Sequence, residues 1–139
     1  MRNLVLDFNI NDSFWDNYER LVNKVVIPYQ EKVLKDEVPG IEKSHAIDNF
    51  KAAADVIQNG KSTDEIYGMV FQDSDVAKWL EAAAYSLSKY PDKEMEKRCD
   101  EVIDLIGRAQ YPDGYLDTYF TVKMPDKKWT DLHEAHELY

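Results

Sequence analysis

Apolar residues recur at helical spacing in four segments of the chain, and short polar segments join them. The first segment has one apolar residue in each turn, namely Phe14, Tyr18, Leu21 and Val25. This spacing is typical of an amphipathic helix, and Asp12 or Ser13 can cap its start. Pro28 lacks an amide proton and crowds the preceding turn, so it predicts the end of this helix, or a kink, near Ile27.

Three further helices follow from the same periodicity. The second should end at Asn59-Gly60, because glycine readily takes the left-handed conformation that closes helices. The third runs from about Ser74 to Lys89, and Asp92 can cap the fourth. Their apolar faces contain Ile47, Phe50, Ala54 and Ile57; then Val76, Trp79, Leu80, Ala83 and Leu87; and then Met95, Cys99, Val102, Ile103, Ile106 and Ala109.

The pattern changes after the fourth helix. Residues 112–114 read Pro-Asp-Gly, which is typical of a turn, and residues 115–124 alternate in a manner that predicts a short extended segment. Residues 129–139 look like the beginning of another helix. The sequence thus predicts a mainly α protein built from helical hairpins, as a single domain over residues 1–139.

Composition narrows the classes of partner. With 27 acidic and 17 basic residues the formal net charge is −10, which argues against nucleic acid and against an anionic membrane surface. No segment approaches the roughly 20 apolar residues that a membrane span needs. The first 15 residues lack the apolar run of a signal peptide, so we expect a cytoplasmic protein. The one cysteine, Cys99, excludes an internal disulfide.

The densest polar cluster lies near the end of the sequence and consists of Asp131, His133, Glu134, His136 and Glu137. A zinc-protease helix needs two histidines four residues apart with a glutamate between them. Here His133 and His136 are three apart, so that motif is not satisfied. Two histidines at this spacing still share a helix face, which leaves weak metal binding open, but the spacing favours histidines that only form hydrogen bonds.

Two other groups of residues could carry chemistry. Asp73 and Asp75 precede the third helix, where a carboxylate pair can serve as acid and base or simply cap the helix and interact with its dipole. Gln110, Asp113 and Tyr115 surround the predicted turn, and such a combination can bind a sugar through a ring face and polar tips. For each aromatic residue alone, burial in the core is favoured. Cys99 lies on an apolar stripe and is interpreted as a structural thiol.

The order and wording of several short segments point further. They are Asp12 to Trp15 with Ile27-Pro28, the run Asp73 to Tyr85 (DSDVAKWLEAAAY), the run Gln110 to Phe120 (QYPDGYLDTYF), and His136-Glu137-Leu138-Tyr139. Each segment is weakly specific alone, but their succession resembles the N-terminal part of the beta-L-arabinofuranosidase family of glycoside hydrolases. The resemblance extends from Asp12 to Tyr139. One departure is Ala77, where the family usually has tyrosine.

This resemblance implies that the helical hairpins form part of an (α/α) barrel, truncated at the C-terminus. It also implies retaining hydrolysis of arabinofuranosides by a cysteine nucleophile and a glutamate acid/base, with zinc held by cysteines and a glutamate. Those groups belong to segments beyond position 139. We therefore expect no catalytic residue, no metal ligand and no cofactor in this chain, zinc being expected only in full-length members, and no activity of the chain alone.

The resemblance carries over a small set of residues. His136 matches the histidine of the His-Glu-Leu-Tyr motif, which implies a place in the sugar pocket. The other substrate-binding candidates match motif positions and are Asp73, Asp75, Gln110, Asp113 and Tyr115. The expected partner is thus a carbohydrate, bound by the complete enzyme. The alternative is a non-catalytic helical module that binds sugar or protein and forms a homo-oligomer through an exposed apolar barrel edge.

Overall fold

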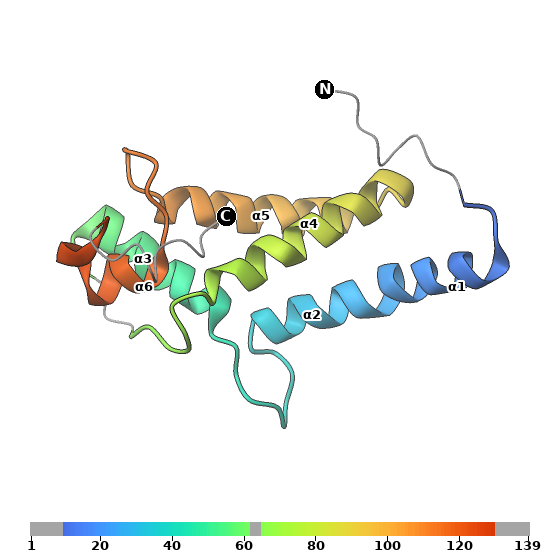
Figure 1. The fold of residues 1–139 in the computed structure, drawn as a ribbon, viewed down its shortest axis with the longest axis horizontal. Coiled ribbons are helices and arrows are strands. Elements are labelled where there is room, and N and C mark those ends of the chain that lie inside the picture. Colours follow the sequence, from blue (N-terminus) through green and yellow to red (C-terminus); the bar gives the residue numbers. More distant parts are fainter. Residues whose placement is uncertain (1–9, 62–64, 130–139) are drawn as a thin grey trace.

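The computed structural model describes residues 10–61 and 65–129, and all regular structure within these ranges is helical (Figure 1). The elements are α1 (Ser13–Leu21), the π-helix η2 (Val22–Val26), α2 (Ile27–Leu34), α3 (Ala46–Asn59), α4 (Asp73–Lys89), α5 (Lys93–Ala109), α6 (Thr118–Lys123) and the 3-10 helix η3 (Pro125–Lys127). The predicted mainly α fold is confirmed. None of the helices in the described ranges is long and apolar enough to cross a membrane.

α1, η2 and α2 form one continuous rod along the molecule (Figure 1). The predicted cap is confirmed, because a carboxylate oxygen of Asp12 accepts the N–H of Phe14 at 2.8 Å. Of the two outcomes predicted for Pro28, the end of the helix near Ile27 does not occur, because α2 continues from that residue. A π-turn precedes it, in which the Ile27 N–H reaches the Val22 carbonyl five residues back. Pro28 then falls in the first turn of α2, where a missing amide proton costs little.

The apolar stripe of the first helix faces solvent. Phe14 is 62% exposed, and Tyr18, Leu21 and Val25 are each about half exposed. No residue of α1 is buried. An amphipathic helix of a complete domain would turn such a stripe toward the core. This face of α1 is therefore an open apolar edge in the described part of the molecule.

The core gathers around α3, which packs against α4, α5 and α6. Ala52 and Ala53 are fully buried, and these small side chains let neighbouring helices approach closely. The left-handed Gly60 ends α3 as predicted. One residue of the predicted faces is misplaced, since Ile103 on α5 is 53% exposed. The main cluster comprises Ile27, Leu34, Ala46, Ile47, Phe50, Ala53, Ala54, Val76, Trp79, Ala83, Met95, Cys99, Val102, Leu105 and Ala109.

The predicted extended segment at 115–124 is also wrong, because α6 occupies Thr118–Lys123. Asp117 starts this helix by accepting the Phe120 N–H at 2.9 Å. The apolar and polar alternation suggested a strand, but Phe120 and Thr121 are buried against the rest of the molecule. Tertiary packing and a helix cap thus override the local preference for extended structure.

Polar contacts fix the long rod against the α4–α5 hairpin. The indole N–H of Trp79 donates to the Ile27 carbonyl at 3.1 Å. The Arg98 guanidinium donates to the Glu31 carboxylate at 3.0 Å, joining α5 to α2. Both contacts are at least part-buried. They therefore hold α2 in a fixed position against α4 and α5.

Candidate functional site

An open groove of about 890 Å³ lies between α2, the start of α4 and two loops. Its size falls within the range of about 300–1,000 Å³ that is usual for small-ligand sites. The groove is lined by Tyr29, Gln30, Val33, Leu34, Glu42, Lys43, Ser44, Gly68, Met69, Gln72, Asp75, Lys78 and Trp79. It thus combines apolar surface with amide, carboxylate and ammonium groups.

Asp75 and Trp79 bring the start of α4 to this groove. They are four residues apart, which places them on the same side of the helix. Trp79 is 3% exposed and is held by its bond to Ile27. Asp75 is exposed, and one of its carboxylate oxygens accepts from the Gln72 amide at 3.3 Å. The carboxylate therefore remains accessible at the edge of the groove.

Gly68 lets the second loop close tightly around Gln72. Its φ of +83° is a conformation that side chains rarely adopt, and a Cβ there would lie 2.7 Å from the Gln72 side-chain oxygen. The backbone conformation therefore favours glycine, and a side chain at this position would also displace the end of the Gln72 side chain. The close approach places the Gln72 amide beside Asp75.

Asp73 joins the starts of α4 and α6. Its two carboxylate oxygens accept from the backbone N–H and the hydroxyl of Thr118, each at 2.7 Å. Both residues are buried. Burial raises the pKa of the Asp73 carboxyl, while the two hydrogen bonds from Thr118 oppose this shift. Both oxygens are already engaged, so Asp73 positions these two helices.

A second buried polar group lies beside this joint. Asp117 is completely buried, and burial raises the pKa of its carboxyl to about 7. Burial also raises the pKa of the Tyr115 hydroxyl, and the nearby Asp117 charge adds to this effect. Among the residues that the structure describes, one oxygen of Asp117 and the hydroxyls of Tyr115 and Thr121 find no hydrogen-bond partner. Such groups are costly to bury, so the sites of these three atoms suit a polar ligand or water.

The turn at 110–115 is held by its own polar side chains. The Gln110 amide donates to the Gly114 carbonyl at 2.9 Å, and the Asp113 carboxylate accepts the Tyr115 N–H at 3.0 Å. Tyr115 packs edge-on against Trp129 with 4.7 Å between ring centroids. In this conformation Gln110 and Asp113 stabilise the turn, and they are exposed.

The structure separates the predicted binding residues. Among the five that the structure describes, only Asp75 lines the groove. Asp73 and Tyr115 lie in the buried polar region, and Gln110 and Asp113 lie in the turn. His136 lies outside the described residues. Sugar contact by these six residues stays a prediction.

Sequence reasoning missed several groove residues. Tyr29 and Gln30 are not among the predicted binding residues, and Trp79 is predicted only as part of an apolar helix face, yet all three line the groove. The spacing of four residues between Asp75 and Trp79 was the signal that could have linked them.

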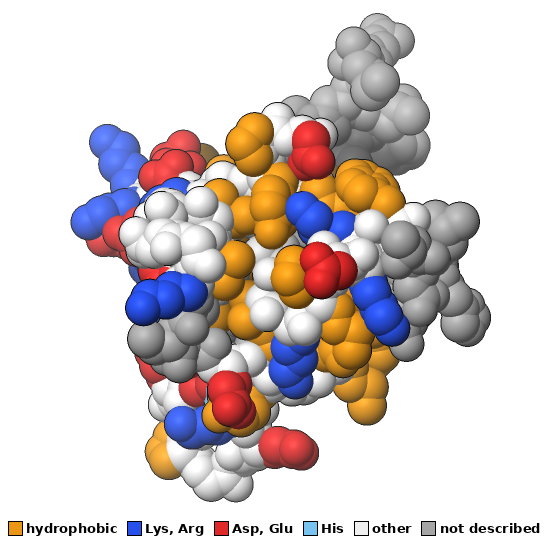
Figure 2. Space-filling model, turned by 90° about the vertical axis from the view of Figure 1, so that its left-hand side faces the viewer, with side chains coloured by type: hydrophobic (Ala, Val, Ile, Leu, Met, Phe, Trp, Pro, Cys, Tyr) orange, Lys and Arg blue, Asp and Glu red, His pale blue; other side chains and the backbone are white. Residues whose placement is uncertain are grey.

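Figure 2 shows the end of the molecule where α6 and η3 lie, with broad hydrophobic areas interrupted by single charges.

The described residues do not fit the zinc site implied by the resemblance. That site needs several cysteines, whereas Cys99 is the one cysteine of the chain and is buried in α5. Burial raises the pKa of its thiol, which disfavours the thiolate needed for metal binding or nucleophilic attack. Within the described ranges, one group of side chains lies close enough together to bind a metal ion, and it contains no cysteine.

Comparisons with known proteins agree with this fold. The chain is 41% identical over 152 residues to a non-reducing end beta-L-arabinofuranosidase of Bifidobacterium longum, covering 96% of this chain and 22% of that protein. It also matches the structure of Ara127N-Se, a GH127 beta-L-arabinofuranosidase from Geobacillus stearothermophilus T6, with 56% identity and a TM-score of 0.85. That match covers 94% of this chain and 20% of the other.

A second structure, the GH127 beta-arabinofuranosidase BT3674, is 30% identical with a TM-score of 0.72, over 93% of this chain and 20% of that one. The chain thus spans about a fifth of the length of the relatives it matches. The helical hairpins are consistent with part of an (α/α) barrel. The sequence profile described as beta-L-arabinofuranosidase, GH127 catalytic domain, matches residues 7–139, and the chain belongs to this family.

Proposed function

We propose that this chain forms one wall of the carbohydrate-binding cleft of a glycoside hydrolase that acts on beta-L-arabinofuranosides, and that it does not hydrolyse them alone. The observation that carries this proposal is the groove between α2 and α4 in a segment that matches the family catalytic domain. The names of the related enzymes supply the substrate class.

The groove has the chemistry that a sugar ring requires. Tyr29 is half exposed and offers a ring face to C–H groups. Gln30 and Asp75 are exposed polar residues that can bind hydroxyl groups. Lys78 extends along the same side of α4 as Ser74, to whose hydroxyl its ammonium group donates at 3.1 Å. Two acidic side chains (Glu42 and Asp75) and two basic ones (Lys43 and Lys78) line the groove, so their formal charges balance. This balance suits a neutral polyol better than a charged ligand.

The groove lining contains no cysteine that could serve as the nucleophile implied by the family resemblance. Such a mechanism needs a nucleophile and an acid/base on opposite sides of the glycosidic bond. Cys99 is buried in the core cluster and is absent from the groove lining. In our proposal, the catalytic cysteine, the glutamate and the zinc that the family resemblance implies belong to other segments of the enzyme.

The first test measures hydrolysis of an aryl beta-L-arabinofuranoside by the purified 139-residue chain. We expect no release of the aryl group above the rate without protein. Hydrolysis that persists through repeated purification and is lost on Cys99→Ser would overturn the assignment of this chain as a non-catalytic wall.

The second test measures binding of L-arabinose by chemical-shift titration. We expect shifts around residues 29–34 and 68–79, and weaker binding in the Tyr29→Ala and Asp75→Ala variants. Asp104→Ala is the matched control, because Asp104 is exposed on α5 and absent from the groove lining. Shifts confined to other parts of the chain would contradict the proposed cleft.

A further inference from the structure

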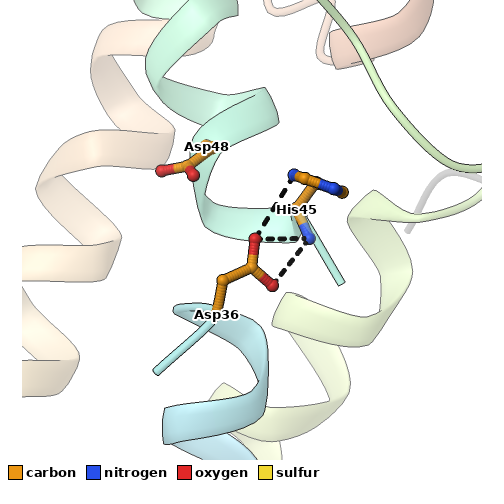
Figure 3. A group of neighbouring side chains, drawn as sticks. All are labelled: Asp36, His45 and Asp48. Atoms are coloured by element: carbon orange, nitrogen blue, oxygen red, sulfur yellow. Dashed lines mark hydrogen bonds and ion pairs between the residues drawn. The ribbon is translucent and has the colours of Figure 1, made fainter. Parts of the chain in front are cut away.

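Three potential metal ligands meet where the loop after α2 leads into α3. They are Asp36, His45 and Asp48, and one ligand atom from each lies within 4.8 Å of the other two. Figure 3 shows the Asp36 carboxylate facing the His45 side chain, with Asp48 on the first turn of α3 beside them. The His45 Nδ1 atom lies 3.3 Å from an Asp36 carboxylate oxygen.

The backbone is bent to bring Asp36 and His45 together. Their φ angles are +59° and +56°, and both are therefore left-handed without being glycine. This conformation costs about 1–2 kcal/mol for an ordinary residue. The Asp36 carboxylate holds the bend by accepting the N–H of Ser44 at 2.7 Å and that of His45 at 3.1 Å. The bend places the carboxylate and the imidazole face to face.

Helix capping explains only part of this arrangement. An acidic residue such as Asp48 is favoured in the first turn of a helix by the helix dipole, and Asp36 satisfies two backbone N–H groups. His45, however, occupies the N-cap position of α3 without making a side-chain cap hydrogen bond. Its ring instead stacks on Tyr67, with 4.6 Å between centroids and 29° between planes. The stacking fixes the imidazole with Nδ1 near Asp36.

We propose that Asp36, His45 and Asp48 bind a divalent transition-metal ion of the zinc type. An imidazole nitrogen and carboxylate oxygens are common ligands of zinc, at about 2.0–2.2 Å. Two ligand atoms then lie at most about 4.4 Å apart. Asp48 can make up the difference, because its side chain is 55% exposed and free to rotate. Its ion pair with Lys51 is also exposed, and such pairs contribute at most about 1 kcal/mol.

The proposed site contains no cysteine, unlike the zinc site that the family resemblance implies. Three protein ligands leave at least one position for water. A bound ion would tie the loop after α2 to the start of α3. Ser44, the residue before His45, lines the groove, so the ion would also fix one edge of that groove.

The test uses Co²⁺ and Zn²⁺ as probes on the full chain. The sequence has three histidines, so His133→Asn and His136→Asn are combined as a background that removes the other two. In this background we expect one Co²⁺ per chain, with a visible absorption spectrum, and displacement by Zn²⁺. Adding His45→Asn or Asp48→Asn should weaken binding at least tenfold, as loss of a ligand does.

Asp104→Asn is the matched control and should leave binding unchanged, because Asp104 is exposed on another helix. Asp36 is left intact, since its loss would remove two backbone hydrogen bonds and disturb folding. Circular dichroism must show equal helix content in every variant compared. Absence of binding in the background protein at 1:1 to 10:1 metal, or equal binding by the His45→Asn variant, would overturn the proposal.

Discussion

The carboxyl of Asp117 is fully buried beside Asp73, and this burial raises its pKa to about 7. An unfolded aspartic acid has a pKa near 3.9. Between these values the folded chain keeps a proton that the unfolded chain releases. The stability that this proton contributes is therefore present below about pH 4 and is lost as the pH rises to about 7.

We accordingly predict that the free energy of unfolding falls between pH 5 and pH 7, by at most about 1.4 kcal/mol per pH unit from this group. Asp117→Asn cannot ionise and should flatten this slope. Urea denaturation across the pH range measures the effect. Asp104→Asn, on the exposed side of α5, should keep the original slope. An equal slope in the Asp117→Asn variant would show that Asp73 or other groups cause it.

Replacing either of two glycines by alanine should change the stability of the chain in opposite directions, because their backbone conformations differ. Gly68→Ala should destabilise the chain by about 1–2 kcal/mol, because its φ is +83° and the new Cβ would meet Gln72. Gly107 lies within α5 with nothing within 4 Å of a built Cβ, so Gly107→Ala should stabilise by about 0.5–1 kcal/mol. Thermal unfolding of both variants measures the difference, and shifts of the same sign would refute the explanation.

At the scale of elements, α5 depends on its cap. Asp92 accepts the N–H groups of Glu94 at 3.0 Å and Met95 at 3.1 Å, and the hydrogen bond from Met95 contributes most to lowering the pKa of its carboxyl. Asp92→Ala should cost about 1 kcal/mol. Asp100→Ala, an exposed change within the same helix, should cost little. Equilibrium unfolding at neutral pH distinguishes the two, and equal losses would argue against the capping role.

The open apolar edge of α1 should drive self-association. This edge comprises Phe14, Tyr18 and Leu21 of α1 and continues with Val25 of η2, all about half exposed or more. Uncovered apolar patches of this kind promote contacts between molecules. Sedimentation velocity should therefore show dimers or larger species that increase with concentration. Tyr18→Glu with Leu21→Glu should restore the monomer. A compact monomer of the unmodified chain at high concentration would contradict this prediction.

The elements themselves were largely predictable, because α3, α4 and α5 follow the 3.6-residue period and end at residues that stop helices. Two errors have physical causes. Pro28 predicts an end or a kink of the helix, and the helix instead continues through a π-turn just before it. No local sequence signal distinguishes this outcome from a helix end. The helix at Thr118–Lys123 depends on burial of Asp117 and Thr118 against Asp73, a contact across 45 residues that periodicity cannot reveal.

For the whole molecule, the groove could be predicted only in part. Asp75 was singled out by the resemblance, and it does line the groove. Tyr29 and Gln30 come from a helix far away in the sequence, and their approach depends on the Trp79–Ile27 and Arg98–Glu31 contacts. Whether the stripe on α1 is covered depends on whatever packs against it, which the spacing of apolar residues in one chain does not specify.

The hydrogen bonds between Thr118 and Asp73 bring the chain, after it has passed through α4 and α5, back to the residue at which α4 begins. α4 and α5 form a hairpin between these two residues, and the turn that joins the two helices lies at the opposite end of α4 from the Asp73–Thr118 contact (Figure 1). Residues inserted at that turn would lengthen the α4–α5 hairpin without displacing Asp73 and Thr118, which are joined at its base. The α4–α5 hairpin should therefore accept extra residues at this turn while the groove beside its base keeps its shape.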